Sequence, residues 1–187
     1  MLSTVLIAVI TAALIFEFIN GFHDTANAIA VSIHTGALSA GRAVALAAVM
    51  NLLGAFASEN VARTISGELI SAAIDEYTII AALIAAIIWN LFTWYLGMPA
   101  SSSHALIGAL IGASVVFTGS TDAVLWKNLV LKVVLPLFLC PPAGFAAGAL
   151  ASLFIKKENR IMQIVASAFV AFSHGENDAQ KTMGIIT

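Results

Sequence analysis

Long apolar runs separated by short polar segments dominate the chain. A transmembrane helix needs about 20 mostly apolar residues. The runs that reach or approach this length cover residues 2–19, 43–58, 78–97, 104–117 and 129–155. A sixth run begins at Ile161 and continues to Phe172, where polar residues interrupt it. The pattern predicts an all-α protein that crosses a membrane several times.

Two of these runs differ from a plain membrane helix. The run 104–117 is short for a full span and predicts a half-helix, similar to a re-entrant segment. The run 129–155 contains Pro136, Pro141 and Pro142. Each proline removes a backbone donor, so we expect this helix to be kinked or broken, with neighbouring helices satisfying the freed carbonyls.

Composition places the chain in a lipid bilayer. Only 10% of its residues are charged and 60% are hydrophobic, whereas soluble domains have about 25% charged residues. We expect a multi-pass protein of the cell membrane, inner or plasma, with no nucleic-acid partner, because the net charge is −2 without a basic stripe. The first run has no basic leader and is interpreted as a retained helix, not a signal peptide. The basic loop 156–160 predicts a cytoplasmic position.

A polar motif, Asn20–Asn27, follows the first apolar run. A carboxylate at membrane depth is costly unless it is paired or lines a water-filled cavity, so Asp24 is a candidate functional group. Gly21 gives the backbone freedom to break the helix here, and Asn27 lies three residues after Asp24, on the same helical face. Such oxygen ligands suit a small cation. An interfacial loop with Asp24 as a helix cap fits the motif equally well.

A second motif, Gly97–His104, contains three consecutive serines. We expect Pro99 to stop the preceding helix and a serine to cap the next one. The hydroxyls of Ser101, Ser102 and Ser103, the free N–H groups of the first turn and the helix dipole together form an anion site without any lysine or arginine. An ordinary capped loop before a Gly-x-x-x-Gly packing helix also fits this motif taken alone.

A third motif, Ser173–Lys181, interrupts the sixth run and partly repeats the first. Phe, Gly and Asp recur at a single offset of 154 residues, so Gly175 and Asp178 correspond to Gly21 and Asp24. The charge density of this motif also fits a solvated helix end. However, repeated hydropathy with interrupted helices is typical of secondary transporters.

The repeat predicts a division of the chain into two parts. Residues 1–154 form a first membrane repeat, and residues 155–187 begin a second, truncated one. The chain therefore looks incomplete, and we expect the missing C-terminal half or a second copy of the chain as a partner.

Single polar residues also lie within apolar runs. Asn20, Asn51 and Asn90 are interpreted as residues that join helices by hydrogen bonds. Glu17 is a candidate functional group, because an intramembrane carboxylate is expensive to bury.

Taken together, three signatures resemble the inorganic phosphate transporter (PiT) family, its bacterial members most closely. The signatures are Gly21-x-x-Asp24-x-x-Asn27, Pro99-x-Ser-Ser-Ser-His104 and Gly175-x-Asn-Asp178. The similarity covers essentially the whole chain, and three signatures in order are more specific than one. A departure is His23, where the family often has Asn. A second Pro-Ser-Ser/Thr-His copy, found in the C-terminal half of family members, is absent.

The resemblance implies a transporter and not an enzyme. It implies two inverted repeats around one site, and symport of inorganic phosphate with Na⁺ or H⁺ and no cofactor beyond that ion. The residues expected to contact phosphate are Ser101, Ser102, Ser103, Asn27, Thr25 and Asn177. The residues expected to serve the cation and coupling are Asp24, Asp178, Asn27, His23 and Glu17, with Na⁺ at Asp24 and Asn27 and at Asp178.

Other functions remain open from the residues alone. Helix-terminus donors and serines also suit another oxyanion, such as sulfate. A membrane-embedded hydrolase would use Asp24, His23 and His104, but the sequence carries no nucleophile elbow or intramembrane-protease motif. A non-transporting membrane subunit is the third alternative.

Overall fold

The computed structural model describes residues 3–57, 60–71, 74–155 and 159–186. Within these ranges the regular structure is helical, and one isolated bridge joins Ile70 to Val124. The elements are α1 (Thr4–His34), α2 (Ala40–Ala55), α3 (Asn60–Gly67), α4 (Glu76–Tyr95), α5 (Ser102–Thr118), η1 (Thr121–Ala123), α6 (Trp126–Leu129), η2 (Val130–Val134), α7 (Leu135–Phe154) and α8 (Arg160–Ile186).

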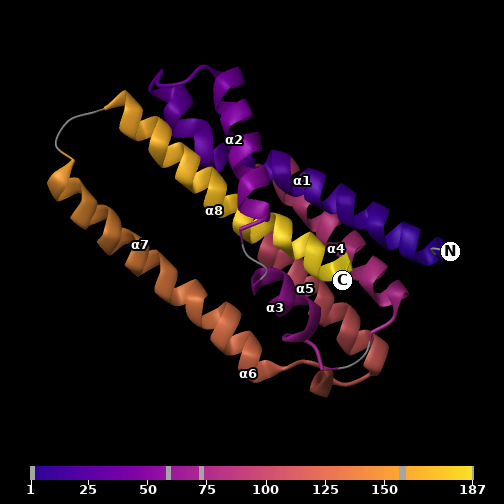
Figure 1. Cartoon of the computed structure of the whole chain (residues 1–187). Coiled ribbons are helices and arrows are strands. Elements are labelled where there is room, and N and C mark those ends of the chain that lie inside the picture. The colour runs from indigo at the N-terminus through magenta and orange to yellow at the C-terminus, as the bar shows by residue number, and fades with distance from the viewer. Residues whose placement is uncertain (1–2, 58–59, 72–73, 156–158, 187) are drawn as a thin grey trace.

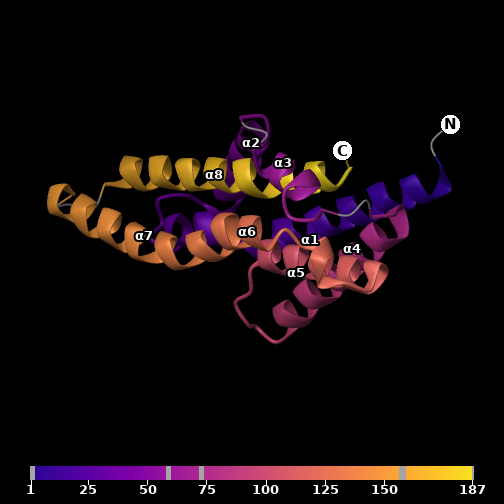
Figure 2. The same cartoon turned by 90° about the horizontal axis from the view of Figure 1, so that it is seen from below.

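Helices α1 and α8 pack against each other at the centre of the bundle (Figure 1). Helices α2 and α3 pack on α8. Helix α4 packs on α1 and, on another side, on α5. Figure 2 shows α2, α3 and α8 on one side of the bundle and α4 and α5 on the other. An apolar core joins α1, α4 and α5; its buried members are Val9, Ala13, Phe16, Leu83, Ala86 and Leu106.

Among the described residues, three helical segments are long and apolar enough to cross a membrane. They are Thr4–His34, Glu76–Tyr95 and Trp126–Phe154, and α2 and α5 are shorter apolar helices. Many large apolar side chains outside the core are exposed, as lipid contact requires. The predicted all-α membrane fold is confirmed. The basic loop predicted to face the cytoplasm falls largely outside the described residues, because 156–158 are not described.

The helix break expected at Gly21 is wrong, and α8 likewise runs unbroken through Gly175. At Gly175 the glycine permits close packing of helices instead, whereas a Cβ on Gly21 would meet nothing within 4 Å. A Cβ on Gly175 would lie 2.1 Å from the carbonyl oxygen of Asn51 in α2. A Cβ on Gly54 would lie 2.1 Å from the carbonyl oxygen of Phe172 in α8. Gly54 and Gly175 therefore let α2 and α8 cross with their backbones in contact.

The break expected before the serine triplet is confirmed. Helix α4 ends at Tyr95, and Gly97 adopts a positive φ of 66° that favours glycine. Ser101 then caps α5, its hydroxyl accepting a hydrogen bond from the N–H of His104. Pro99, which cannot continue a helix, lies between the two. The half-helix α5 starts where the sequence predicts.

The prolines of the fifth run do not break it. A five-residue π-helical turn, η2, precedes Pro136, and α7 continues through Pro141 and Pro142. A π turn changes the hydrogen-bonding register, which accommodates a residue that lacks an N–H group. Lys132, in this turn, forms an ion pair with Glu68, after α3.

Candidate functional site

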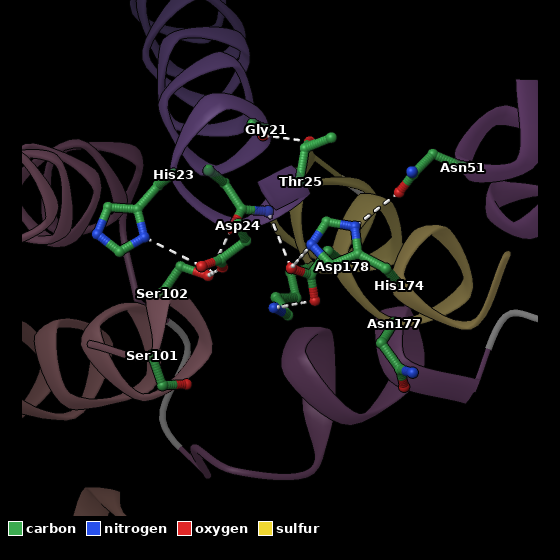
Figure 3. Close-up of polar contacts among 12 residues, drawn as sticks. Gly21, His23, Asp24, Thr25, Asn51, Ser101, Ser102, His174, Asn177 and Asp178 are labelled. Carbon is green, nitrogen blue, oxygen red and sulfur yellow. Dashed lines mark hydrogen bonds and ion pairs between the residues drawn. The ribbon is translucent and has the colours of Figure 1, made fainter. Parts of the chain in front are cut away.

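The candidate site lies where α1, α5 and α8 meet (Figure 3). The hydrogen bonds of Asn20 connect the three helices there. The Asn20 side chain is fully buried. Ser102, in the first turn of α5, donates a hydrogen bond of 2.5 Å to Asn20 Oδ1. Asn20 Nδ2 donates one of 3.2 Å to Oδ2 of Asp178 in α8. One amide thus links three helices.

Asp24 lies one turn after Asn20 and faces the same serine. Ser102 Oγ is 3.0 Å from Asp24 Oδ2. A hydroxyl carries one proton, so Ser102 donates to Asn20 or to Asp24 but not to both at once. The other Asp24 oxygen lies 3.0 Å from Nδ1 of His23. The Asp24 carboxylate therefore has lone pairs left for a further ligand.

Asp178 is the most heavily paired carboxylate of the site. Its Oδ1 lies 2.5 Å from Lys181 Nζ, and its Oδ2 lies 3.1 Å from His174 Nε2. His174 Nδ1 in turn is 2.6 Å from the side-chain oxygen of Asn51. The Asn51 amide is held in this orientation because its Nδ2 donates to the carbonyl of Ala47 at 2.8 Å. Helix α2 thereby fixes His174 beside Asp178.

The beginning of α5 supplies donors for an anion. The N–H of Ala105 donates the first hydrogen bond of the helix, to the carbonyl of Ser101. The N–H groups of Ser102 and Ser103 come before it and have no carbonyl partner within the helix. The positive end of the helix dipole lies at the same point. The Ser101 hydroxyl is exposed and lies 2.8 Å from Nδ1 of His104.

A cavity of about 280 Å³ lies between α1 and the end of α4 with the loop that precedes α5. The cavity is lined by His23, Asp24, Asn27, Trp94, Gly97, Met98, Pro99 and Ala100. It has room for a small ion with several waters, since one water occupies about 30 Å³. Larger cavities, of about 590 and 540 Å³, lie along α4 and α5 and are lined mainly by apolar side chains.

One cluster could hold a cation. Asp24, His174 and Asp178 each offer a ligand atom, and these atoms lie within 4.8 Å of one another. Carboxylate oxygens suit Na⁺ and other hard cations, whereas an imidazole nitrogen suits transition metals.

Several predicted residues come together in this site. Asp24, Ser102 and Asp178 share the Asn20 network, and His23 contacts Asp24. Asn27 is exposed and lines the cavity beside Asp24. Ser101 and Ser103 flank Ser102 at the start of α5.

Three predicted residues lie outside this network. Thr25 donates to the carbonyl of Gly21, and Asn177 donates to the carbonyl of Ser173 at 2.7 Å, each within its own helix. Glu17 accepts a hydrogen bond of 2.6 Å from Thr182, further along the α1–α8 contact. The roles assigned to these residues stay predictions.

The structure adds four residues to the site. From the sequence, Asn20 and Asn51 are predicted only to join helices, and no role is predicted for His174 and Lys181. The repeat holds the missing signal, because His174 lies 154 residues after Asn20 and Lys181 lies 154 residues after Asn27. Applying the offset to every position of the first motif would have found both.

Comparison with known proteins confirms the family resemblance. Residues 20–160 match the profile of the phosphate transporter family. The chain is 45% identical, over 200 residues, to the probable low-affinity inorganic phosphate transporter of Bacillus subtilis (strain 168), covering 97% of this chain and 58% of the relative. It is 41% identical, over 187 residues, to the protein of the same name from Streptomyces halstedii, covering 92% of this chain and 86% of the relative.

A solved structure shares the fold. It is named "The sodium-dependent phosphate transporter" and superposes with a TM-score of 0.82 at 23% identity, covering 98% of this chain and 66% of that chain. The chain spans about half the length of the Bacillus subtilis relative and of a Mycobacterium bovis one. Since the family profile matches most of the chain, the chain belongs to the phosphate transporter family.

Proposed function

We propose that this chain forms part of a symporter that moves inorganic phosphate across the inner or plasma membrane together with Na⁺ or H⁺. One observation carries the proposal. The Ser102 hydroxyl at the start of α5 lies 3.0 Å from Asp24, and Asp24 and Asn27 line a cavity whose facing wall is the loop Gly97–Ala100 directly before α5. Anion donors and a carboxylate thus lie next to each other beside one small cavity. Membership of the phosphate transporter family supports phosphate as the anion.

In this proposal the anion binds at the positive end of α5. The N–H groups of Ser102 and Ser103 and the hydroxyls of Ser101 and Ser103 donate to phosphate oxygens, because a helix N-terminus favours negative charge. Asn27 adds an amide from the α1 side of the cavity.

Asp24 provides the coupling. A carboxylate beside a phosphate repels it unless a cation lies between them or a protonated phosphate oxygen donates a hydrogen bond to the carboxylate. Phosphate therefore binds well only together with Na⁺ or H⁺. Sulfate has no proton to donate at neutral pH, so the same carboxylate disfavours the rival oxyanion. Asp178 adds a second carboxylate to the same cluster.

The rest of the cavity wall in this proposal comes from a second repeat. That repeat belongs to a C-terminal half or to a second copy of the chain, and rocking of one repeat against the other alternates access to the site. The 58% coverage of the Bacillus subtilis relative is consistent with this arrangement.

The test is labelled-phosphate binding to the purified chain at varied Na⁺ concentration and pH, with sulfate as competitor. Asp24→Asn should lose the cation dependence. Its affinity at saturating cation should fall roughly 10- to 150-fold, because a hydrogen bond to a charged group contributes about 1.5–3 kcal/mol. Asp122→Asn is the matched control, since Asp122 lies in η1, away from the site. Unchanged cation dependence in Asp24→Asn would overturn the role of Asp24, and equal competition by sulfate would favour a general oxyanion site.

A further inference from the structure

Lys181 is a buried cation inside the site. The lysine is 4% exposed, and its ammonium lies 2.5 Å from Asp178 Oδ1. A lysine is almost never this buried unless it is paired, because removing an ammonium from water costs several kcal/mol. Lys181 lies in the last turns of α8, where a long side chain would be free to extend towards the helix end. It turns inward to the carboxylate instead.

The ammonium leaves little room for a free cation at Asp178. The second oxygen, Oδ2, already accepts from Asn20 at 3.2 Å and faces His174 at 3.1 Å. Both carboxylate oxygens of Asp178 therefore have donors from within the described part of the chain. Asp24 differs, because its contacts are the hydroxyl of Ser102 and the ring of His23.

The internal repeat allows the surroundings of Asp24 and Asp178 to be compared position by position. Asp24 and Asp178 lie at equivalent positions, 154 residues apart. Three residues after Asp24 comes Asn27, a neutral amide that lines the cavity. Three residues after Asp178 comes Lys181. In one copy the third residue after the carboxylate is a neutral amide, and in the other it is a lysine that forms an ion pair with the carboxylate.

We propose that Lys181 is a built-in counter-ion that occupies the place of a coupling cation at Asp178. Asp24 is then the one carboxylate of this cluster that takes a cation from solution. The ligand atoms of Asp24 and Asp178 lie within 4.8 Å of each other, so two bare carboxylates would strongly repel an incoming phosphate. Lys181 cancels one of the two charges permanently. Lys181 thus sets how many cations bind with each phosphate, which rests on the proposed function.

Na⁺ binding to the purified chain tests this inference without using phosphate. Lys181→Met should bind one more Na⁺ per chain than the unmodified protein, measured with radioactive Na⁺. The added site should disappear in the double variant Asp178→Asn/Lys181→Met and should not arise in Lys181→Arg, which keeps the charge. Lys132→Met is the matched control, because Lys132 pairs with Glu68 outside the site. It should bind the same number of Na⁺ ions as the unmodified protein.

Thermal unfolding covers the case in which Lys181→Met folds poorly. The unfolding midpoint of Lys181→Met should rise with NaCl but not with choline chloride of equal ionic strength, since a ligand of the native state stabilises it. The rise with NaCl should be larger for Lys181→Met than for the unmodified chain. Equal Na⁺ stoichiometry in Lys181→Met and the unmodified chain, or a midpoint that responds equally to both salts, would overturn the inference. Because neither readout involves phosphate, a failure of phosphate binding alone would count against the proposed function and not against this one.

Discussion

Substituting Gly175 tests whether the α2–α8 crossing positions the site. Gly175→Ala adds a Cβ that would lie 2.1 Å from the carbonyl oxygen and 2.5 Å from the Cα of Asn51. Carbon–oxygen contacts in proteins are about 3.3–3.6 Å. The helices must therefore move apart by about 1 Å or more. Both close atoms are backbone atoms, so no side-chain rotation relieves the clash.

The same displacement breaks a hydrogen bond of the site. His174 Nδ1 is 2.6 Å from Asn51 Oδ1, and a further 1 Å takes the pair to a distance at which a hydrogen bond is weak or absent. Overpacking costs about 1–3 kcal/mol, and the lost hydrogen bond about 0.5–1.5 kcal/mol. Gly175→Ala should therefore lower the free energy of unfolding by about 1.5–4.5 kcal/mol.

Reversible unfolding of the detergent-solubilised chain, followed by circular dichroism, measures this loss. Gly21→Ala is the matched control, because Gly21 lies inside α1 and a Cβ there meets nothing within 4 Å. That substitution should be neutral or stabilise the chain by about 0.5–1 kcal/mol through helix propensity. If Gly175→Ala is as stable as Gly21→Ala, the close crossing of α2 and α8 does not exist as described.

Two further predictions concern α4. The hydroxyl and N–H of Thr78 donate to Asp75 and hold the pKa of that carboxyl below its usual value. The stability that this cap contributes is present above the ordinary pKa of about 3.9 and is lost as pH falls through the lower folded value. Asp75→Ala should abolish this part of the acid dependence of the unfolding midpoint, and an unchanged acid profile would contradict it. Asn90 is 1% exposed, and neither of its side-chain polar atoms has a hydrogen-bond partner in the described part of the chain. Asn90→Leu should be neutral or stabilising by up to about 2 kcal/mol in the same unfolding assay, whereas a marked loss of stability would show an unseen partner.

Local chemistry explains what could be predicted from the sequence. Pro99 and the serine triplet mark the start of α5 because a missing N–H and an N-cap hydroxyl act within a few residues. The apolar runs predict the membrane-spanning helices for the same reason, since length and hydropathy are properties of one segment. Membrane depth, the internal repeat and the first signature all indicate Asp24, and its contact with Ser102 agrees with that expectation.

The remaining features depend on partners that are distant in sequence. Glycine permits either a helix break or a close approach, and only the position of α2 shows that Gly175 serves the approach. The pairing of Lys181 with Asp178 is local, but its burial depends on the packing of α8 against α1 and α3. His174 becomes part of the site through Asn51, 123 residues earlier. The 154-residue repeat indicates the positions of His174 and Lys181, but neither it nor hydropathy shows which residues they contact.

The position of a bound phosphate analogue tests the central claim most directly. Arsenate has the shape and charge of phosphate, and its arsenic atom can be located by anomalous X-ray scattering. The account predicts an arsenic peak at the start of α5, with oxygens within hydrogen-bond distance of Ser101–Ser103 and on the same side as Asp24 and Asn27. A peak in the cavity of about 590 Å³ beside Tyr77 and Phe117 instead, or no peak near Ser102 at saturating arsenate, would contradict the account.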